Sequence, residues 1–171
     1  MKSLLRQTTV LLWTLLLIPL FTACNDEDDV EEIFMNKVWK MSRLTAEGNT
    51  GQFPAGFWSD QASYNNSMTA FSREDTYTIE FKAGSGGSTS GGTFTAQAVK
   101  ATLTGDWTVD GKNGLLTLNV KKQSTTESDI LAKKFIEGLK KISRYEGSSK
   151  QITLFFEEGQ ATWLIGFTPK P

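Results

Sequence analysis

GDWTVDGKNGLLTLNVK, residues 105–121, is the stretch that decides the fold class of this chain. Apolar residues occupy alternate positions on both sides of a turn, as at Trp107 and Val109 before it and at Leu116 and Leu118 after it. A period of two is typical of a β-strand that buries one face. The Asp-Gly and Asn-Gly pairs between the two runs supply the positive φ angles that tight hairpins need. The stretch therefore predicts two antiparallel strands joined by a short turn.

Other short alternating runs lie on both sides of this hairpin. The most regular of them is Thr76–Ala83, in which Tyr77, Ile79 and Phe81 share one face. The remaining predicted strands are residues 38–44, 94–103, 151–156 and 161–167, with a turn at 157–160 between the last two. About seven short strands in sequence order predict a mainly β (α+β) domain, an antiparallel meander curled into a small barrel or half-barrel.

One segment has the period of a helix instead. Between about Ser128 and Ile142, apolar residues recur at Leu131, Phe135 and Leu139, a spacing that places them on one face of a helix. The serine at the start is a suitable N-cap, and the aspartate after it suits the positive end of the helix dipole. The sequence therefore predicts one amphipathic helix before the last two strands, packed on the sheet.

Residues 51–71 interrupt the strand pattern with a long connection that is rich in aromatic side chains. Phe53, Phe57, Trp58 and Tyr64 lie there among glycine, serine, asparagine and aspartate. Such connections tend to be functional or to contain a short helix. The four aromatic residues are the candidate ligand or partner contacts, because they could form a lip that stacks on a glycan or covers an apolar ligand. They could also plug the open end of the barrel, which we favour, or meet a protein partner.

The first 23 residues have the parts of a secretory signal peptide. Lys2 and Arg6 precede an apolar run that continues to Ala23. This run is shorter than the about 20 residues that a membrane-spanning helix needs, and Pro19 would break a helix near its end. We therefore predict that residues 1–23 are a cleaved signal peptide.

The segment Phe21-Thr22-Ala23-Cys24 resembles a lipobox, the site at which the lipoprotein peptidase cleaves before a cysteine. Cys24 is the only cysteine of the chain, so it has no disulfide partner within it. The resemblance implies that Cys24 carries diacylglycerol on its sulfur. Three acyl chains, such as palmitate, would then hold the mature protein on a membrane.

Residues 24–35 contain an acidic run, Asn25–Asp29, with Glu31 and Glu32 close behind. Such a block repels itself and buries little apolar surface, so we predict an acidic tether that leaves residues 36–171 as a single domain. An acidic run directly after a lipidated cysteine is similar to the export signal of Bacteroidota surface lipoproteins. That resemblance implies an outer-membrane protein, with the cell-surface face favoured over the periplasmic face.

The composition excludes several function classes. The chain has 18 basic and 19 acidic side chains, and loss of the signal peptide brings its net charge to about −3. A nucleic-acid partner needs clustered excess base, so none is expected. Histidine is absent and the only cysteine is the lipidation candidate, which removes imidazole bases, thiol nucleophiles and the usual zinc ligands. We expect no enzyme, no catalytic residue, no metal and no cofactor.

Three features together resemble META/HslJ-type and lipocalin-like lipoprotein domains of unknown function. They are the opening strand around Trp39, the Gly-Asp-Trp meander at Trp107, and a helix from Phe135 that runs into a hairpin reaching Phe155. The likeness spans residues 36–168. It implies a cell-envelope lipoprotein with a non-catalytic barrel that has a binding or structural role. The alternatives are an accessory or inhibitor-type protein-interaction module at the cell surface, and a small-ligand binder with an aromatic lip.

Overall fold

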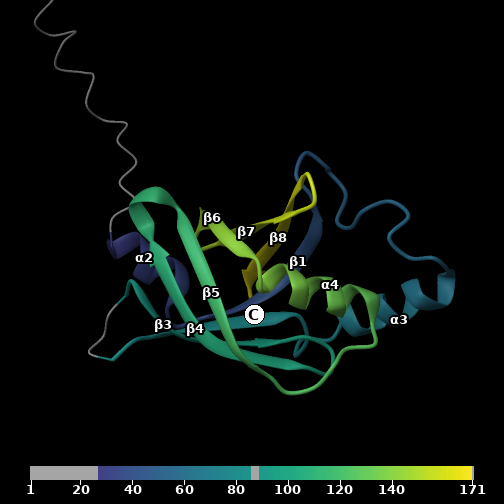
Figure 1. Cartoon of the computed structure of the whole chain (residues 1–171), viewed down its shortest axis with the longest axis horizontal. Helices are drawn as coiled ribbons and strands as arrows, with labels where there is room; N and C mark the ends of the chain where they lie inside the picture. Colours follow the sequence, from purple (N-terminus) through teal and green to yellow (C-terminus); the bar gives the residue numbers. More distant parts are fainter. Residues whose placement is uncertain (1–26, 86–88, 171) are drawn as a thin grey trace, which may run out of the picture.

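The computed structural model describes residues 27–85 and 89–170. In these residues eight strands form one closed antiparallel barrel in sequence order, and the last strand pairs with the first (Figure 1). The prediction of a mainly β fold, with a meander curled into a barrel, is confirmed. The strands are β1 Val38–Ala46, β2 Thr78–Ala83, β3 Gly91–Gln97, β4 Thr102–Asp110, β5 Leu115–Gln123, β6 Ile142–Ser148, β7 Gln151–Glu158 and β8 Ala161–Pro169. The helices are α2 Glu27–Phe34, α3 Gln61–Phe71, α4 Ile130–Leu139 and the 3₁₀ turn η1 Gly111–Asn113.

The central hairpin forms as its sequence predicts. Trp107 lies opposite Leu118, and Val109 lies opposite Leu116, so the apolar residues of β4 and β5 share the face that turns inward. Gly114 ends the turn with a φ of +65°, in the left-handed region that glycine adopts without steric cost. The Asn-Gly pair therefore has the structural role that the sequence assigns to it.

The region after this hairpin contains one more strand than the sequence indicates. Helix α4 begins after Asp129, whose carboxylate accepts the N–H of Ala132 at 2.9 Å, and it ends before Lys140. Ile142, expected as the last helix residue, instead begins β6, so three strands follow the helix. The side chain of Ile142 is buried. A helix and a strand would both bury an apolar residue at this position. The sequence pattern therefore does not distinguish the start of β6 from the last turn of the predicted helix.

Side chains fill the barrel from one end to the other. At one end Phe34 of α2 contacts Phe81, Trp107 and Tyr145, with ring centroids 4.9 to 5.5 Å apart. At the opposite end Phe135 of α4 contacts the ring of Tyr77 at 5.5 Å. The largest side chains that are fully buried include Trp39, Trp107, Tyr77, Phe34, Phe81, Phe94, Phe135, Phe156 and Phe167. Eight strands give an interior just wide enough for such a packed core.

Helix α2 moves the start of the folded domain toward the N-terminus. The expected tether, residues 24–35, overlaps this helix, in which Val30, Ile33 and Phe34 are buried. These three residues lie at i, i+3 and i+4, an apolar stripe that the surrounding acidic residues hide in the sequence. The domain therefore begins within the predicted tether and not at residue 36. Cys24 and the predicted signal peptide, residues 1–23, lie outside the described residues.

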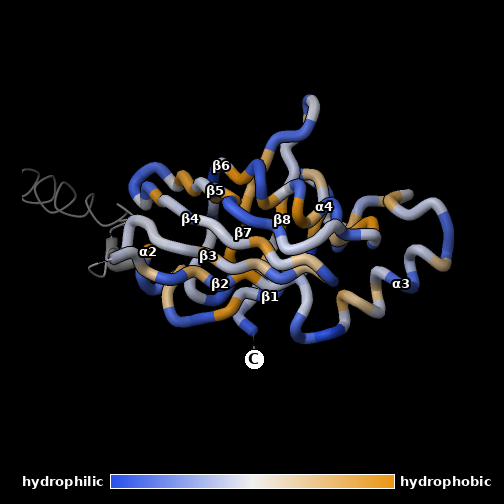
Figure 2. The backbone as a smooth tube through the Cα atoms, turned by 60° about the horizontal axis from the view of Figure 1, so that its bottom comes forward, coloured by the Kyte–Doolittle hydropathy of each residue, from blue (hydrophilic) through white to orange (hydrophobic). Residues whose placement is uncertain are grey.

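The two helical additions lie at opposite ends of the barrel. Figures 1 and 2 both place α2 at one end and α3 at the other, with α4 near the α3 end. Figure 2 also shows hydrophilic and hydrophobic residues in alternation along the strands, as a wall with one buried face requires. The long connection between β1 and β2 thus projects from the end that α2 does not cover.

We predict that Phe34→Ala destabilises the protein strongly, because it removes a ring that closes the barrel interior. The expected loss is about 3 to 5 kcal/mol in the free energy of unfolding, measured by urea denaturation. Glu31→Ala, an exposed position on the same helix, is the matched control and should change stability by less than about 0.5 kcal/mol. Equal, small effects of both substitutions would show that α2 is not part of the core.

Candidate functional site

The insert, defined here as residues 47–77 between β1 and β2, contains helix α3 and the four aromatic candidate residues. Asp60 caps α3, and its carboxylate accepts the backbone N–H of Ser63 at 2.8 Å and the hydroxyl of Ser63 at 2.9 Å. These hydrogen bonds hold the pKa of Asp60 below its usual value. The cap fixes where the helix starts, and thereby the helix face on which Tyr64 lies.

The structure brings the four aromatic candidates into one aromatic cluster, consisting of Phe53, Phe57, Trp58 and Tyr64. The ring of Trp58 lies at the centre, 4.9 Å from Phe57, 5.1 Å from Tyr64 and 5.5 Å from Phe53. All three contacts are edge-to-face, with interplanar angles of 84° to 88°, a geometry that aromatic pairs prefer. Tyr64 is 41% exposed, and the other three rings are half-buried.

The aromatic cluster forms a second layer over an end that α4 already closes. Phe53 contacts Phe71 at 5.3 Å, and Phe71 contacts Tyr77, which belongs to the barrel core. Ser67 and Ala70 of α3 are buried, so part of the insert packs on the domain as the plug interpretation requires. The rings that fill this barrel end are Phe135 of α4 and Tyr77, the last residue of the insert, and not those of the aromatic cluster. The cluster therefore surrounds no opening into the interior.

A carboxylate holds the insert to the start of α4. Trp58 Nε1 donates to Ser67 Oγ at 2.9 Å, and Ser67 Oγ donates to Asp129 Oδ2 at 2.7 Å. The hydroxyl of Tyr77 donates to Asp129 Oδ1 at 3.0 Å, beside the N–H of Ala132 that the same oxygen caps. We call Trp58, Ser67, Tyr77 and Asp129 the Asp129 junction. It connects the insert to α4. The sequence predicts Ser128 as the N-cap and gives Asp129 only a favourable place at the helix dipole, so the cap lies one residue later than predicted, and the contacts with the insert are not predicted.

The chain leaves the insert through a strained residue. Tyr77 has a φ of +52°, a conformation that costs a bulky L-residue about 1 to 2 kcal/mol. Lys40 Nζ braces this turn by donating to the carbonyl oxygens of Thr76 at 2.5 Å and Arg73 at 2.7 Å, under the rings of Phe71 and Tyr77. Burial among these groups lowers the pKa of Lys40 to about 8, although the charge of Asp75 opposes the shift. The insert is thus fixed at both ends.

Three of the surface grooves among the described residues have linings that differ in charge. One, of about 400 Å³, separates α3 from the start of α4 and is lined by Ser63, Asn66, Ala70, Val99, Ser128, Asp129 and Ile130. A second, of about 420 Å³, runs along β5 and is lined by residues 118–123 and Lys140. The first groove has neutral side chains, both polar and apolar, apart from the hydrogen-bonded carboxylate of Asp129, whereas the second is rich in lysine.

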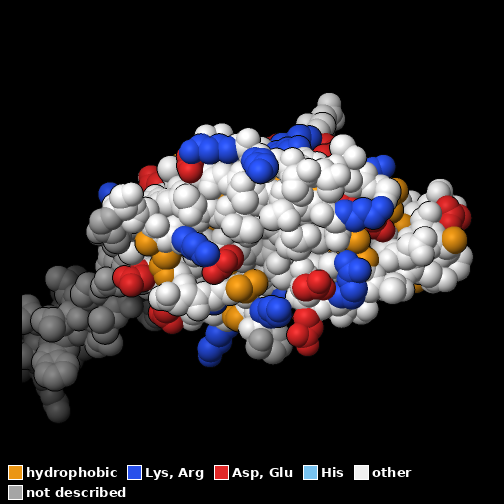
Figure 3. Space-filling model, turned by 90° about the horizontal axis from the view of Figure 1, so that it is seen from below, with side chains coloured by type: hydrophobic (Ala, Val, Ile, Leu, Met, Phe, Trp, Pro, Cys, Tyr) orange, Lys and Arg blue, Asp and Glu red, His pale blue; other side chains and the backbone are white. Residues whose placement is uncertain are grey.

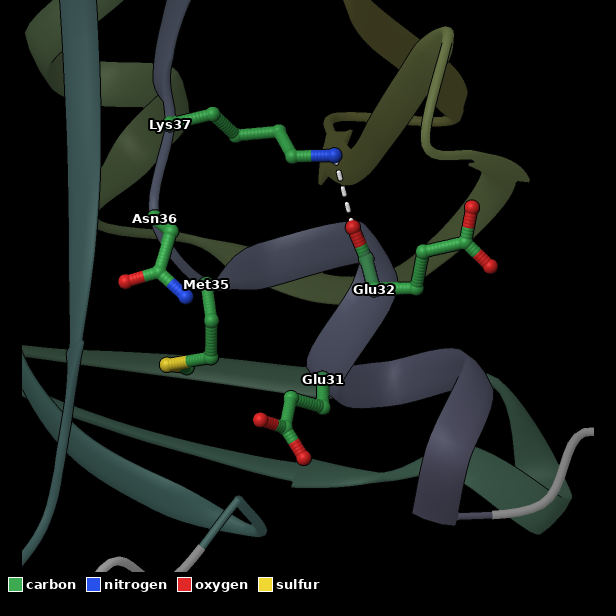
Figure 4. A pocket seen from close by; sticks show the side chains of 5 residues that line it. All are labelled: Glu31, Glu32, Met35, Asn36 and Lys37. Atoms are coloured by element: carbon green, nitrogen blue, oxygen red, sulfur yellow. Dashed lines mark hydrogen bonds between the residues drawn. The ribbon is translucent and has the colours of Figure 1, made fainter.

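The third groove, of about 450 Å³, lies beside α2 and carries both signs of charge. Figure 4 shows Lys37 reaching back to the main-chain carbonyl of Glu32, a hydrogen bond of 2.6 Å, while the carboxylates of Glu31 and Glu32 point in different directions. The Glu32 carboxylate accepts the hydroxyl of Ser149 at 2.7 Å. Lys37 and the Glu32 carboxylate thus have hydrogen-bond partners within the protein, so the groove resembles a helix-end contact more than a ligand site.

The face seen from below carries no dominant charge. Figure 3 shows basic and acidic side chains interspersed on it, with hydrophobic side chains only in small separate groups among the described residues. Within residues 27–85 and 89–170, no three acidic side chains gather where they could hold a metal ion. No helix in the same part of the chain is long and apolar enough to cross a membrane.

The fold defines this protein as a mainly β domain, a closed and filled antiparallel barrel with a few helices. The chain belongs to a family described as Domain of unknown function (DUF4847), which matches residues 25–169. It is similar to the crystal structure of a DUF4847 family protein from Bacteroides vulgatus ATCC 8482, with a TM-score of 0.58 and 26% sequence identity. The match covers 81% of this chain and 96% of that chain. No curated protein matches the chain.

We predict that Tyr77→Phe destabilises the protein by about 1 to 2 kcal/mol at pH 8, because a buried hydrogen bond to a carboxylate is lost. Burial and the charge of Asp129 raise the pKa of Tyr77 well above its usual value. An unfolded tyrosine loses its proton near pH 10, so the stabilisation is complete below about pH 10 and declines above it. Urea denaturation should show the difference between the two proteins shrinking from pH 8 to pH 11. A difference that stays constant would contradict the prediction.

Proposed function

We propose that this protein is a non-catalytic, lipid-anchored protein of the bacterial outer membrane that binds another protein through the aromatic cluster. The observation that carries the proposal is the filled barrel, whose ends are occupied by Phe34 and Phe135. The closed meander supports the resemblance to lipocalin-like domains in architecture. Lipocalin-like barrels that hold a ligand keep it in their interior. Here side chains occupy that volume, so the function is assigned to the outer surface.

The position of α2 supports a defined orientation on the membrane. Cys24 precedes Glu27, the first residue of α2, by three positions, and α2 packs on one end of the barrel. Acyl chains on Cys24 would hold that end near the bilayer. The insert projects from the opposite end (Figure 1). The aromatic cluster would then face away from the membrane, where a partner protein can reach it.

The chemistry of the aromatic cluster suits a protein contact. Tryptophan and tyrosine are enriched among the residues that contribute most to binding, since they offer large contact areas with few rotatable bonds. Tyr64 is exposed, and Trp58 is held by its hydrogen bond to Ser67. The Asp129 junction lowers the entropy that the insert would lose on binding. The aromatic cluster is thus a rigid, partly exposed surface that a partner protein could bind.

The acidic residues of the domain support a non-catalytic role. Asp60 caps α3, Asp110 caps the 3₁₀ turn η1, and Asp129 caps α4. Asp106 and Glu158 pair with Lys121 and Lys134. These carboxylates have structural partners, as expected of residues that stabilise a fold.

We predict that Cys24→Ala removes the lipid anchor. The variant should leave the detergent phase of a Triton X-114 extraction, because three acyl chains contribute far more membrane affinity than the remaining chain can. Asn25→Ala, which leaves the cysteine intact, is the matched control and should stay in the detergent phase. Mass spectrometry that finds an unmodified sulfur on Cys24 in protein from the native envelope would refute the anchor.

We predict that a photo-crosslinking amino acid at position 64 captures a discrete partner protein in the living source bacterium, whereas the same group at position 150 does not. Lys150 is the matched control because it is exposed and lies outside both the insert and β5. Phe57→Ser should weaken the adduct, since Phe57 packs against the central ring of Trp58. Binding of a purified glycan at the cluster, without any protein adduct, would replace this proposal with the sugar-binding alternative.

A further inference from the structure

Strand β5 loses its neighbour on one side soon after it begins. Strand β4 pairs with it from Leu115 opposite Asp110 to Gln123 opposite Leu103, with one register shift between Val120 and Lys122. On the other side the register with β6 contains a single pair, Leu115 with Arg144. In the part of the chain that the structure describes, no strand lies beside the rest of this edge. The next element of the chain is α4, which closes the barrel end with side chains instead of backbone pairing.

The backbone groups on this edge have a defined direction. The N–H of Tyr145 donates to the carbonyl oxygen of Gly114, just before β5, at 2.8 Å, so Leu115 and Arg144 form a pair without direct hydrogen bonds and the backbone of Leu116 points toward β6. Every second residue of an antiparallel strand points its N–H and C=O groups to the same side. Leu118 and Val120 therefore direct their backbone groups to that side too, beyond the point where pairing with β6 stops. Backbone groups of this kind require water or another strand as partner.

The groove of about 420 Å³ lies along this edge. Leu118 is buried and Val120 is half-buried, so these residues give the groove an apolar base. Lys122 and Lys140 are exposed on its two sides, one on β5 and the other directly after α4. The groove thus combines unpaired backbone, apolar side chains and positive charge, which are the elements that recognise an extended peptide.

The positive charge of the groove determines which kind of peptide strand can bind there. Lys121 pairs with Asp106, whereas Lys140 donates to the neutral side chain of Gln123 at 2.9 Å. Lys122 makes no ion pair within residues 27–85 and 89–170. Lysine on a strand edge disfavours pairing with a second copy of the same edge, because like charges would meet. A strand that carries carboxylates would meet opposite charge instead.

We propose that β5 binds an extended, acidic segment of another protein by strand addition. The backbone of Leu118 and Val120 hydrogen-bonds to the segment, and Lys122 and Lys140 pair with its carboxylates. This contact goes beyond the proposed function and does not use the aromatic cluster. A negative result at one of the two sites would therefore leave the proposal for the other unchanged.

The test uses the full chain, purified in mild detergent, and a short blocked peptide of alternating threonine and glutamate. Two matched peptides separate charge from backbone pairing: one has glutamine for glutamate, and the other keeps glutamate but has every backbone nitrogen methylated. Both should bind at least about tenfold more weakly than the glutamate peptide. Amide hydrogen exchange at Leu118 and Val120, followed by NMR, should slow when the glutamate peptide binds.

A pair of variants locates the site. Lys122→Glu with Lys140→Glu should weaken binding of the glutamate peptide at least about tenfold. Lys112→Glu with Lys150→Glu makes the same change in net charge at exposed positions outside the groove, and should leave the affinity within about twofold. Equal binding of the methylated peptide would reduce the contact to charge attraction and overturn the proposal. Absence of binding at millimolar peptide would overturn it, as would self-association of the chain that the peptide displaces.

Discussion

The volume inside an eight-stranded barrel is the constraint on which the rest of this structure depends. Such an interior is just wide enough for side chains to fill. A void inside it would lower the stability of the fold, because the side chains around the void would lose van der Waals contacts. Here the strands alone do not complete the filling: Phe34 enters from α2 at one end, and Phe135 enters from α4 at the other. The two helices are therefore part of the core. This also explains why the family match begins at residue 25, ahead of the first strand.

The same constraint accounts for the attachment of the insert. Helix α4 must be held in the barrel end, and its N-cap Asp129 also accepts hydrogen bonds from Ser67 and Tyr77. One carboxylate thus fixes both the helix that closes the barrel and the loop that covers it. The strained φ of Tyr77 is tolerated because its ring and hydroxyl are both fully engaged. Rigidity at the aromatic cluster is in this sense a consequence of how the barrel is closed.

The sequence predicts most of the barrel and little of what lies at its ends. Alternation and Asn-Gly chemistry identify the β4–β5 hairpin because both depend on neighbours in the chain. Helix α2 is not predicted because acidic residues surround its short apolar stripe. Strand β6 is not predicted because Ile142 also continues the helical period of the preceding segment. The four aromatic candidates do come together, as their density in one connection indicates. The Asp129 junction joins residues up to 71 positions apart in sequence, from Trp58 to Asp129, and no local pattern contains such a contact.

A filled barrel also determines where recognition can occur. With the interior occupied, contacts are left to side chains outside the wall and to backbone groups that the wall does not pair. The aromatic cluster is the first kind, and the edge of β5 is the second. The second exists because α4 closes the barrel with side chains where a longer β6 would have closed it with hydrogen bonds. An unpaired edge of this kind can pair with any strand, and in our proposal its lysines restrict that pairing to strands of opposite charge.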